Sequence, residues 1–144
     1  MTAKSLLAAL TLIGGATLIT VLAAAEQAAP LSSALVQRGE YLVEKVGMCA
    51  DCHSPRNERG EFIKASYLGG APLGFTAAVP MPAWASVAPP IAGLPSMNER
   101  QAIVFLTTGK RPDGTTARPP MPEFRFNGDD ARAVTAYLRS LGKK

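Results

Sequence analysis

The sequence predicts an all-α domain with three main helices joined by long loops. Apolar residues recur at helical spacing in three segments, over residues 34–47, 96–109 and 127–142. No segment shows the sustained apolar–polar alternation that indicates a half-buried β-strand. The 13 glycines and 12 prolines in 144 residues predict a large share of irregular chain between the helices.

Residues 1–25 have the pattern of an export segment. Lys4 is followed by an apolar run over residues 6–25, which is long enough to span a bilayer. Gly14-Gly15 interrupts this run, and small residues before Glu26 offer a cleavage site. A cleaved signal peptide is therefore favoured, and a retained N-terminal membrane anchor is the alternative. Both place the rest of the chain in the periplasm, on the exported side of the inner membrane.

Residues 26–33 are predicted to be a linker, and residues 34–144 the folded domain. Ser32 or Ser33 can cap a helix over residues 34–47. Gly39 lies in the middle of this helix, where glycine costs about 1 kcal/mol relative to alanine. The position either tolerates that cost or is crossed closely by another helix.

The first helix leads into Cys49-Ala50-Asp51-Cys52-His53, which contains both cysteines and the only histidine. This spacing is the attachment signature of a c-type haem, in which both thiols form thioethers and the histidine is the proximal iron ligand. The alternatives are a redox disulfide, half of a zinc site, a structural disulfide and a chance run. A redox pair usually accompanies a βαβ pattern, which is missing, and two thiolates with one imidazole leave zinc a ligand short.

Residues 54–95 form a long segment that glycines and prolines break repeatedly. Apolar residues lie throughout it, so it needs a surface to pack against, and a haem would supply one. A second helix is expected to open at Ser96, with Glu99 completing a capping box, and to end at Gly109. A third helix is expected after Asn127 or Asp129.

The second axial ligand of the iron cannot be another histidine of this chain. Met121 lies in a Pro-Pro-Met-Pro run that fixes its backbone, and Met81 also lies between prolines. Met48 adjoins the attachment motif, and Met97 falls in the first turn of a predicted helix. The sequence favours Met121, with Met81 and an open iron site as alternatives.

The net charge of +4 is spread along the chain rather than gathered in one run. Nucleic-acid binding is therefore not expected, and docking to a redox protein partner is. Five cations are candidates for a positive collar at the haem edge, or are simply solvated: Arg56, Arg59, Lys64, Lys110 and Arg111. The single histidine is needed for the iron, so the chain is not expected to be an enzyme.

Five runs of the sequence resemble the class I cytochromes c: residues 38–43, 49–55, 108–114, 120–124 and 133–141. The resemblance covers about residues 34–142. It is strongest to the cytochrome c domains and subunits of periplasmic or membrane-bound alcohol and aldehyde dehydrogenases. It implies a monohaem cytochrome c fold, with three main helices and long loops wrapped around one covalent haem c and its iron.

The resemblance also assigns roles to single residues. It implies that Met121 is the distal ligand, that Gly39 meets Tyr137 at a helix crossing, and that the Pro55 carbonyl accepts the imidazole N–H. The family's Asn-Ile-Thr-Pro run before the middle helix is replaced here by residues 89–95. Haem propionates would then need other partners, for which the candidates are Trp84, Arg118 and Arg125.

The predicted function is one-electron transfer through a single haem with His53 and Met121 as axial ligands. The chain would act as a periplasmic carrier or cytochrome subunit, with a dehydrogenase, an oxidase or another cytochrome as partner. One alternative is a membrane-anchored subunit fixed in a respiratory, photosynthetic or dehydrogenase complex. Another is an open-site haem that acts on peroxide or binds a gas.

Overall fold

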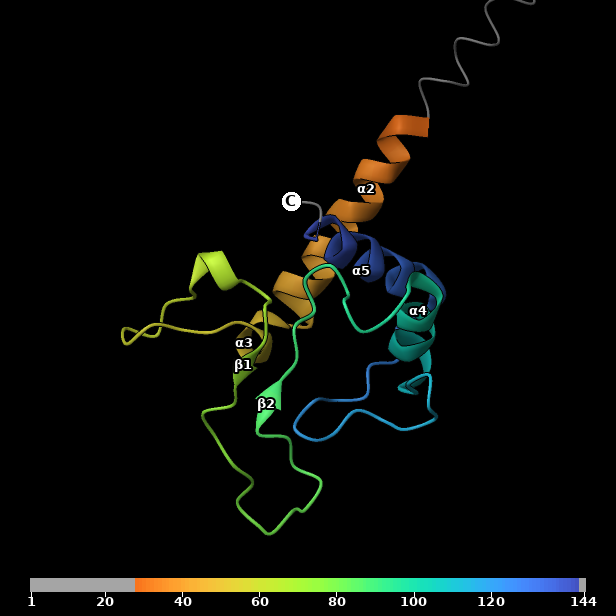
Figure 1. Ribbon diagram of the computed structural model, residues 1–144. Coiled ribbons are helices and arrows are strands. Elements are labelled where there is room, and N and C mark those ends of the chain that lie inside the picture. Colours follow the sequence, from red (N-terminus) through yellow and green to blue (C-terminus); the bar gives the residue numbers. More distant parts are fainter. Residues whose placement is uncertain (1–27, 143–144) are drawn as a thin grey trace, which may run out of the picture. The chain divides into compact units, whose positions relative to one another are not determined.

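The computed structural model of this chain describes residues 28–142 (Figure 1). The predicted signal peptide or anchor at residues 1–25 lies outside the described residues. Contacts within the chain divide it into two compact units, Met1–Ser33 and Ala34–Lys144. The site described below belongs entirely to the second unit.

Most of the regular secondary structure in the described chain is helical, and one small sheet is also present. The elements in order are α2 (Ala28–Tyr41), η1 (Leu42–Val46), α3 (Ala50–His53), η2 (Lys64–Ser66), β1 (Ala71–Pro72), β2 (Val87–Ala88), α4 (Glu99–Thr108) and α5 (Gly128–Ser140). The strands pair antiparallel, with Ala71 opposite Ala88. The all-α prediction is therefore correct for the helices but omitted this sheet, whose two-residue strands are too short to show an alternating pattern.

The first helix begins earlier than predicted. Residues 28–33, expected to belong to a linker, already form the start of α2. Pro30 is compatible with this because proline is tolerated in the first turn of a helix. The helix then continues from α2 into η1, a π-helical turn that closes with a 2.7 Å bond from the Gly47 amide to the Leu42 carbonyl.

Gly39 lies where α2 crosses α5. A β-carbon added at Gly39 would lie 1.9 Å from the carbonyl oxygen of Ala133 and 2.7 Å from Cβ of Tyr137. Only glycine fits this approach, so the close crossing at Tyr137 is confirmed. The Tyr137 hydroxyl donates a 2.9 Å hydrogen bond to Oε1 of Glu44, and the Tyr67 hydroxyl donates to the other oxygen. Glu44 thereby ties η1 to α5 and to the segment after η2.

The caps of the two later helices are only partly those expected. Asn98, not Ser96, caps α4, and its side chain and that of Gln101 form a reciprocal capping box. Residues 94–97 form a tight turn instead, in which the Met97 amide donates to the Leu94 carbonyl at 3.3 Å. The predicted end of this helix at Gly109, with φ of 72°, and the predicted Asn127 cap of α5 are confirmed.

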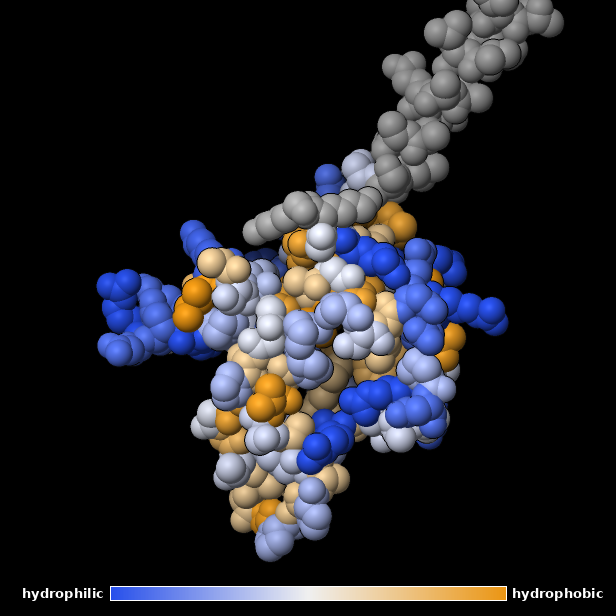
Figure 2. Space-filling model, in the orientation of Figure 1, coloured by the Kyte–Doolittle hydropathy of each residue, from blue (hydrophilic) through white to orange (hydrophobic). Residues whose placement is uncertain are grey.

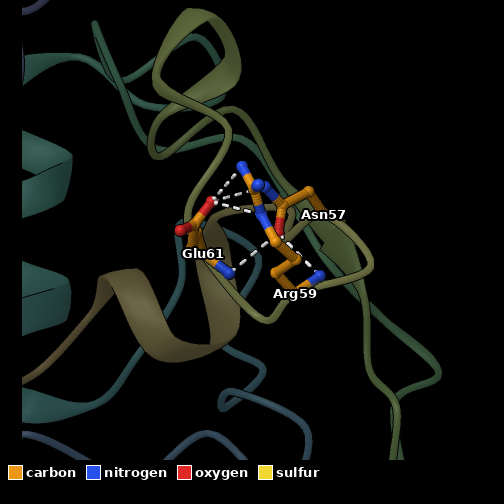
Figure 3. A network of polar contacts seen from close by, with 3 residues as sticks. All are labelled: Asn57, Arg59 and Glu61. Atoms are coloured by element: carbon orange, nitrogen blue, oxygen red, sulfur yellow. Dashed lines mark hydrogen bonds and ion pairs between the residues drawn. The ribbon is translucent and has the colours of Figure 1, made fainter.

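The segment after the attachment motif folds back onto it. The Gly70 amide donates to the His53 carbonyl, and the Leu68 amide to Oγ of the buried Ser54, both at 2.8 Å. Leu68 is fully buried in the core. Residues 57–61 form an exposed turn, in which the side chains of Asn57 and Arg59 converge on Glu61 (Figure 3).

The contact at Gly39 predicts a large loss of stability on substitution. We expect Gly39→Ala to lower the free energy of unfolding of the haem-loaded protein by about 3 kcal/mol, because the added methyl group meets backbone and not a movable side-chain tip. Urea denaturation would measure this. Gly74→Ala is the matched control, since nothing lies within 4 Å of a β-carbon there. Equal losses in the two variants would contradict the assigned crossing.

Candidate haem site

The second unit contains an apolar cavity of about 580 Å³. Its walls come from η1, α3, α4, α5 and two further segments, which are residues 85–97, including β2, and residues 111–126. The volume falls within the range of roughly 300–1,000 Å³ that is usual for small-molecule and cofactor sites. Leu106, Val134 and Leu138 contribute both to this wall and to the hydrophobic core.

Cys49 and Cys52 both line this cavity and do not form a disulfide. Burial raises the pKa of the Cys49 thiol to about 11, and the negative charge of Glu44 acts in the same direction. Redox-active Cys-x-x-Cys pairs depend on a lowered thiol pKa, because the thiolate is the nucleophile. The environment of Cys49 therefore does not favour thiol–disulfide exchange, and it leaves a thiol facing an apolar cavity.

His53 is buried at the end of α3 and lines the same cavity. Its Nδ1 lies 2.7 Å from the carbonyl oxygen of Pro89. A carbonyl can only accept, so Nδ1 carries the proton and Nε2 keeps its lone pair. Burial also lowers the pKa of His53, although the Pro89 carbonyl opposes this shift. A neutral imidazole with one nitrogen held by a carbonyl is the form that binds metals.

The prediction that Pro55 supplies this carbonyl is wrong. The Pro55 oxygen accepts a 2.9 Å hydrogen bond from the Ile63 amide instead. After α3 the chain becomes extended at Ser54, with φ of −120° and ψ of 134°, so Pro55 enters the local turn. Pro89 was missed because the folded-back loop, and not the spacing from His53, brings its carbonyl to the ring.

The two proline-flanked methionines lie in different places. Met121 lines the cavity, whereas Met81 is exposed and lies outside the lining. Met48 and Met97 also contribute to the wall. Met48 is 58% exposed and adjoins Cys49 directly, so most of its side chain faces solvent. Of the two candidates that the sequence favoured for the distal ligand, only Met121 reaches the site.

Trp84, Arg118 and Arg125 were the candidates for contacts with the cofactor's acidic groups. Arg118 lines the cavity, and its Nε and Nη2 donate to the Ala83 and Trp84 carbonyls at 2.9 and 2.8 Å. Trp84 is outside the lining, and its indole N–H points to the Phe75 carbonyl at 3.4 Å. Arg125 is also outside it and pairs with a neighbouring glutamate at 3.5 Å.

Two of the five cations predicted to form a positive collar are paired with carboxylates. Arg56 pairs with Asp51 at 2.9 Å, and Arg59 pairs with Glu61 at 3.0 Å. Arg111 does reach the site, where it lines the cavity and donates to the Thr116 carbonyl. The sequence could not reveal the pairing of Arg56 and Arg59 with carboxylates, because it depends on how residues 51–61 fold back on themselves.

Within residues 28–142, no three His, Cys, Asp or Glu side chains come together as a metal-binding cluster. Within the same range, no helix combines the length and apolar composition that a membrane crossing requires.

No protein-family model matches the chain. Three similar proteins are the fructose dehydrogenase cytochrome subunit of Gluconobacter japonicus (30% identical over 112 residues), a diheme cytochrome c-type protein of Cereibacter sphaeroides (32% over 113) and the cytochrome c subunit of the quinone alcohol dehydrogenase of Gluconobacter oxydans (31% over 122).

These matches cover 74%, 73% and 77% of this chain but only 22%, 35% and 25% of the relatives. The chain thus spans a third or less of the length of most of these proteins. The similarity agrees with the cavity, the attachment motif and the runs noted in the sequence. Over about three quarters of its length, the chain is related by sequence to the c-type cytochrome subunits of dehydrogenases.

Proposed function

We propose that this chain transfers single electrons through one haem c, bound covalently at Cys49 and Cys52 and ligated by His53 and Met121. The observation that carries the proposal is that these four side chains, from segments far apart in sequence, line one apolar cavity. When bound, haem c supplies a one-electron iron couple. A single Cys-x-x-Cys-His run supports one haem per chain.

The residues of the site are suited to hold a cofactor and not a substrate. His53 and Met121 would occupy both axial positions, and a methionine ligand raises the reduction potential. The Pro89 carbonyl fixes the imidazole tautomer and ring orientation. The apolar wall excludes water, which also affects the potential. Met121 in that wall weighs against an iron open to peroxide or gases.

The relatives support a dehydrogenase as the electron donor. Two of the three are named as cytochrome subunits of fructose and quinone alcohol dehydrogenases. We therefore infer a non-catalytic electron-transfer role, as a subunit of such a complex or as a carrier that serves it. Residues 1–25 would direct the domain to the periplasm, either as a cleaved signal or as an anchor.

Removal of the distal ligand tests the proposed coordination. Met121→Ala should keep covalent haem but lower the reduction potential, within the roughly 0.8 V range that axial ligands span. The variant should also bind external ligands. Redox titration and absorption spectra would measure both changes, including loss of the methionine–iron charge-transfer band. Met81→Ala is the control and should match wild type. An unchanged potential in Met121→Ala would rule out this ligand.

Removal of both thiols tests whether the haem completes the core. The double variant Cys49→Ala, Cys52→Ala should carry no covalent haem and should yield little folded protein, because the cavity wall is continuous with the core. Haem staining after denaturing electrophoresis and circular dichroism would show this. Met81→Ala, at an exposed methionine outside the cavity lining, should retain both haem and fold. A stable fold without haem would contradict the argument.

The intact mass of the mature protein tests the fate of residues 1–25. A soluble carrier should have lost them and gained one haem, whereas an anchored subunit should retain the full chain plus one haem. Mass spectrometry of the protein purified from its exported location distinguishes the two. A mass without any added haem would contradict the proposed function itself.

A further inference from the structure

Residues 73–86 form a loop between β1 and β2 that extends away from the helices (Figure 1). We call these residues the β1–β2 loop. No Lys, Arg, Asp or Glu occurs in the loop, and Figure 2 shows this region, at the bottom of the view, in orange, tan and pale colours. The loop therefore has no carboxylate that could pair with a cation, and it offers a neighbouring arginine only uncharged acceptors such as backbone carbonyls.

Both ends of the β1–β2 loop are fixed on the side of the proximal histidine. Next to β1, the Gly70 amide donates to the His53 carbonyl at 2.8 Å. Next to β2, the Pro89 carbonyl accepts from the imidazole at 2.7 Å. The two strands pair with each other, and the Leu73 amide donates to the Ser86 carbonyl at 2.9 Å. A group that the loop binds is therefore also fixed relative to His53.

The far part of the β1–β2 loop is ordered by contacts of its own. The rings of Phe75 and Trp84 pack edge to face, with centroids 5.9 Å apart. The Trp84 amide donates to the Met81 carbonyl at 2.9 Å. These contacts hold the backbone at Trp84, and with it two neighbouring carbonyls, in a defined position.

The segment that carries Met121 has few hydrogen-bond donors of its own. The prolines at positions 119, 120 and 122 lack an N–H group. The Met121 amide donates locally, to the Arg118 carbonyl at 3.2 Å. Such a segment can form few bonds to the rest of the protein through its own amides. Its position therefore depends on donors from elsewhere and on side chains at its edges.

Three hydrogen bonds join this segment to the β1–β2 loop. The Ala85 amide donates to the Pro119 carbonyl at 2.7 Å. In the opposite direction, Nε and Nη2 of Arg118 donate to the carbonyls of Ala83 and Trp84 at 2.9 and 2.8 Å. Among the described residues, Arg118 forms no ion pair. A guanidinium suits this paired contact because its N–H groups form a rigid planar fork.

We propose that Arg118 is a positioning residue for Met121, which keeps the methionine at the iron and so keeps external ligands out. This inference rests on the proposed function. Arg118 and Met121 both line the cavity and are three residues apart. Through the β1–β2 loop, the segment that holds the proximal histidine also holds the distal methionine. Loss of the arginine contact would convert a closed electron carrier into a haem protein with a site open to peroxide or gases.

Imidazole binding to the ferric holoprotein tests this role, because imidazole can bind the iron only after Met121 has left it. At saturating imidazole, stopped-flow absorption should give a binding rate at least tenfold higher in Arg118→Gln than in wild type. Arg125→Gln is the matched control and should match wild type, since Arg125 lies four residues after Met121 but outside the cavity lining. An unchanged rate in Arg118→Gln, or an equal rise in both variants, would overturn the inference.

Arg118→Lys separates the paired contact from the charge. This variant keeps the positive charge but not the planar pair of donors, so it should also bind imidazole faster than wild type. A wild-type rate in Arg118→Lys would overturn the inference, because the charge alone would then be sufficient.

Amide hydrogen exchange of the holoprotein gives a readout without any added ligand. In Arg118→Gln, the Ala85 amide, which bonds to the Met121 segment, should exchange at least tenfold faster than in wild type. The Gly70 amide, which bonds to the His53 carbonyl, should exchange at its wild-type rate. Unchanged exchange at Ala85 contradicts the proposal. So does equal acceleration at both amides, because Arg118 would then stabilise the whole fold and not one segment.

The wild-type spectrum separates this inference from the proposed function. If wild type shows the methionine–iron charge-transfer band and Arg118→Gln binds imidazole at the wild-type rate, only the role of Arg118 is overturned. If wild type lacks that band, the distal ligand of the proposed function is overturned, and this inference with it.

Discussion

The hydrogen bond between His53 and the Pro89 carbonyl is the interaction on which the arrangement of the site depends. It joins the attachment motif to a residue 36 positions later, across the whole irregular segment. The bonds from Gly70 to His53 and from Ile91 to Leu68 close the same segment at intermediate points. One contact thus both selects the imidazole tautomer and closes the loop that forms much of the cavity wall.

Structural features that depend on only a few neighbouring residues could be predicted from the sequence. The Gly109 stop and the Asn127 cap depend on a few neighbouring residues, and the structure has these two helix ends where they were expected. The close approach at Gly39 was also predictable, since a mid-helix glycine needs an explanation and a family resemblance supplied one. Met121 was preferred over Met81 because it lies between two predicted helices and matches the distal ligand in the family resemblance, and only Met121 lines the cavity.

The errors share a different cause, which is tertiary folding of the irregular segment. Asn98 displaced Ser96 as a cap because residues 94–97 are used in a turn. Pro89 displaced Pro55 because the segment folds back on the histidine. The charges of Arg56 and Arg59 are neutralised by partners that the same folding provides. None of these pairings can be read from spacing alone, because each depends on a contact that no short window of sequence specifies.

The π-helical turn of η1 connects the crossing at Gly39 to the attachment motif. Leu42 and Val43 are buried within the turn, which contacts α5. The Gly47 amide donates to the Leu42 carbonyl at 2.7 Å, and the Cys49 amide donates to the Val43 carbonyl at 3.0 Å. The helix ends between these two bonds, at Met48, where φ is 45°. The bond from Cys49 therefore spans the break in the helix, and it fixes the start of the attachment motif to a turn that is itself packed against α5.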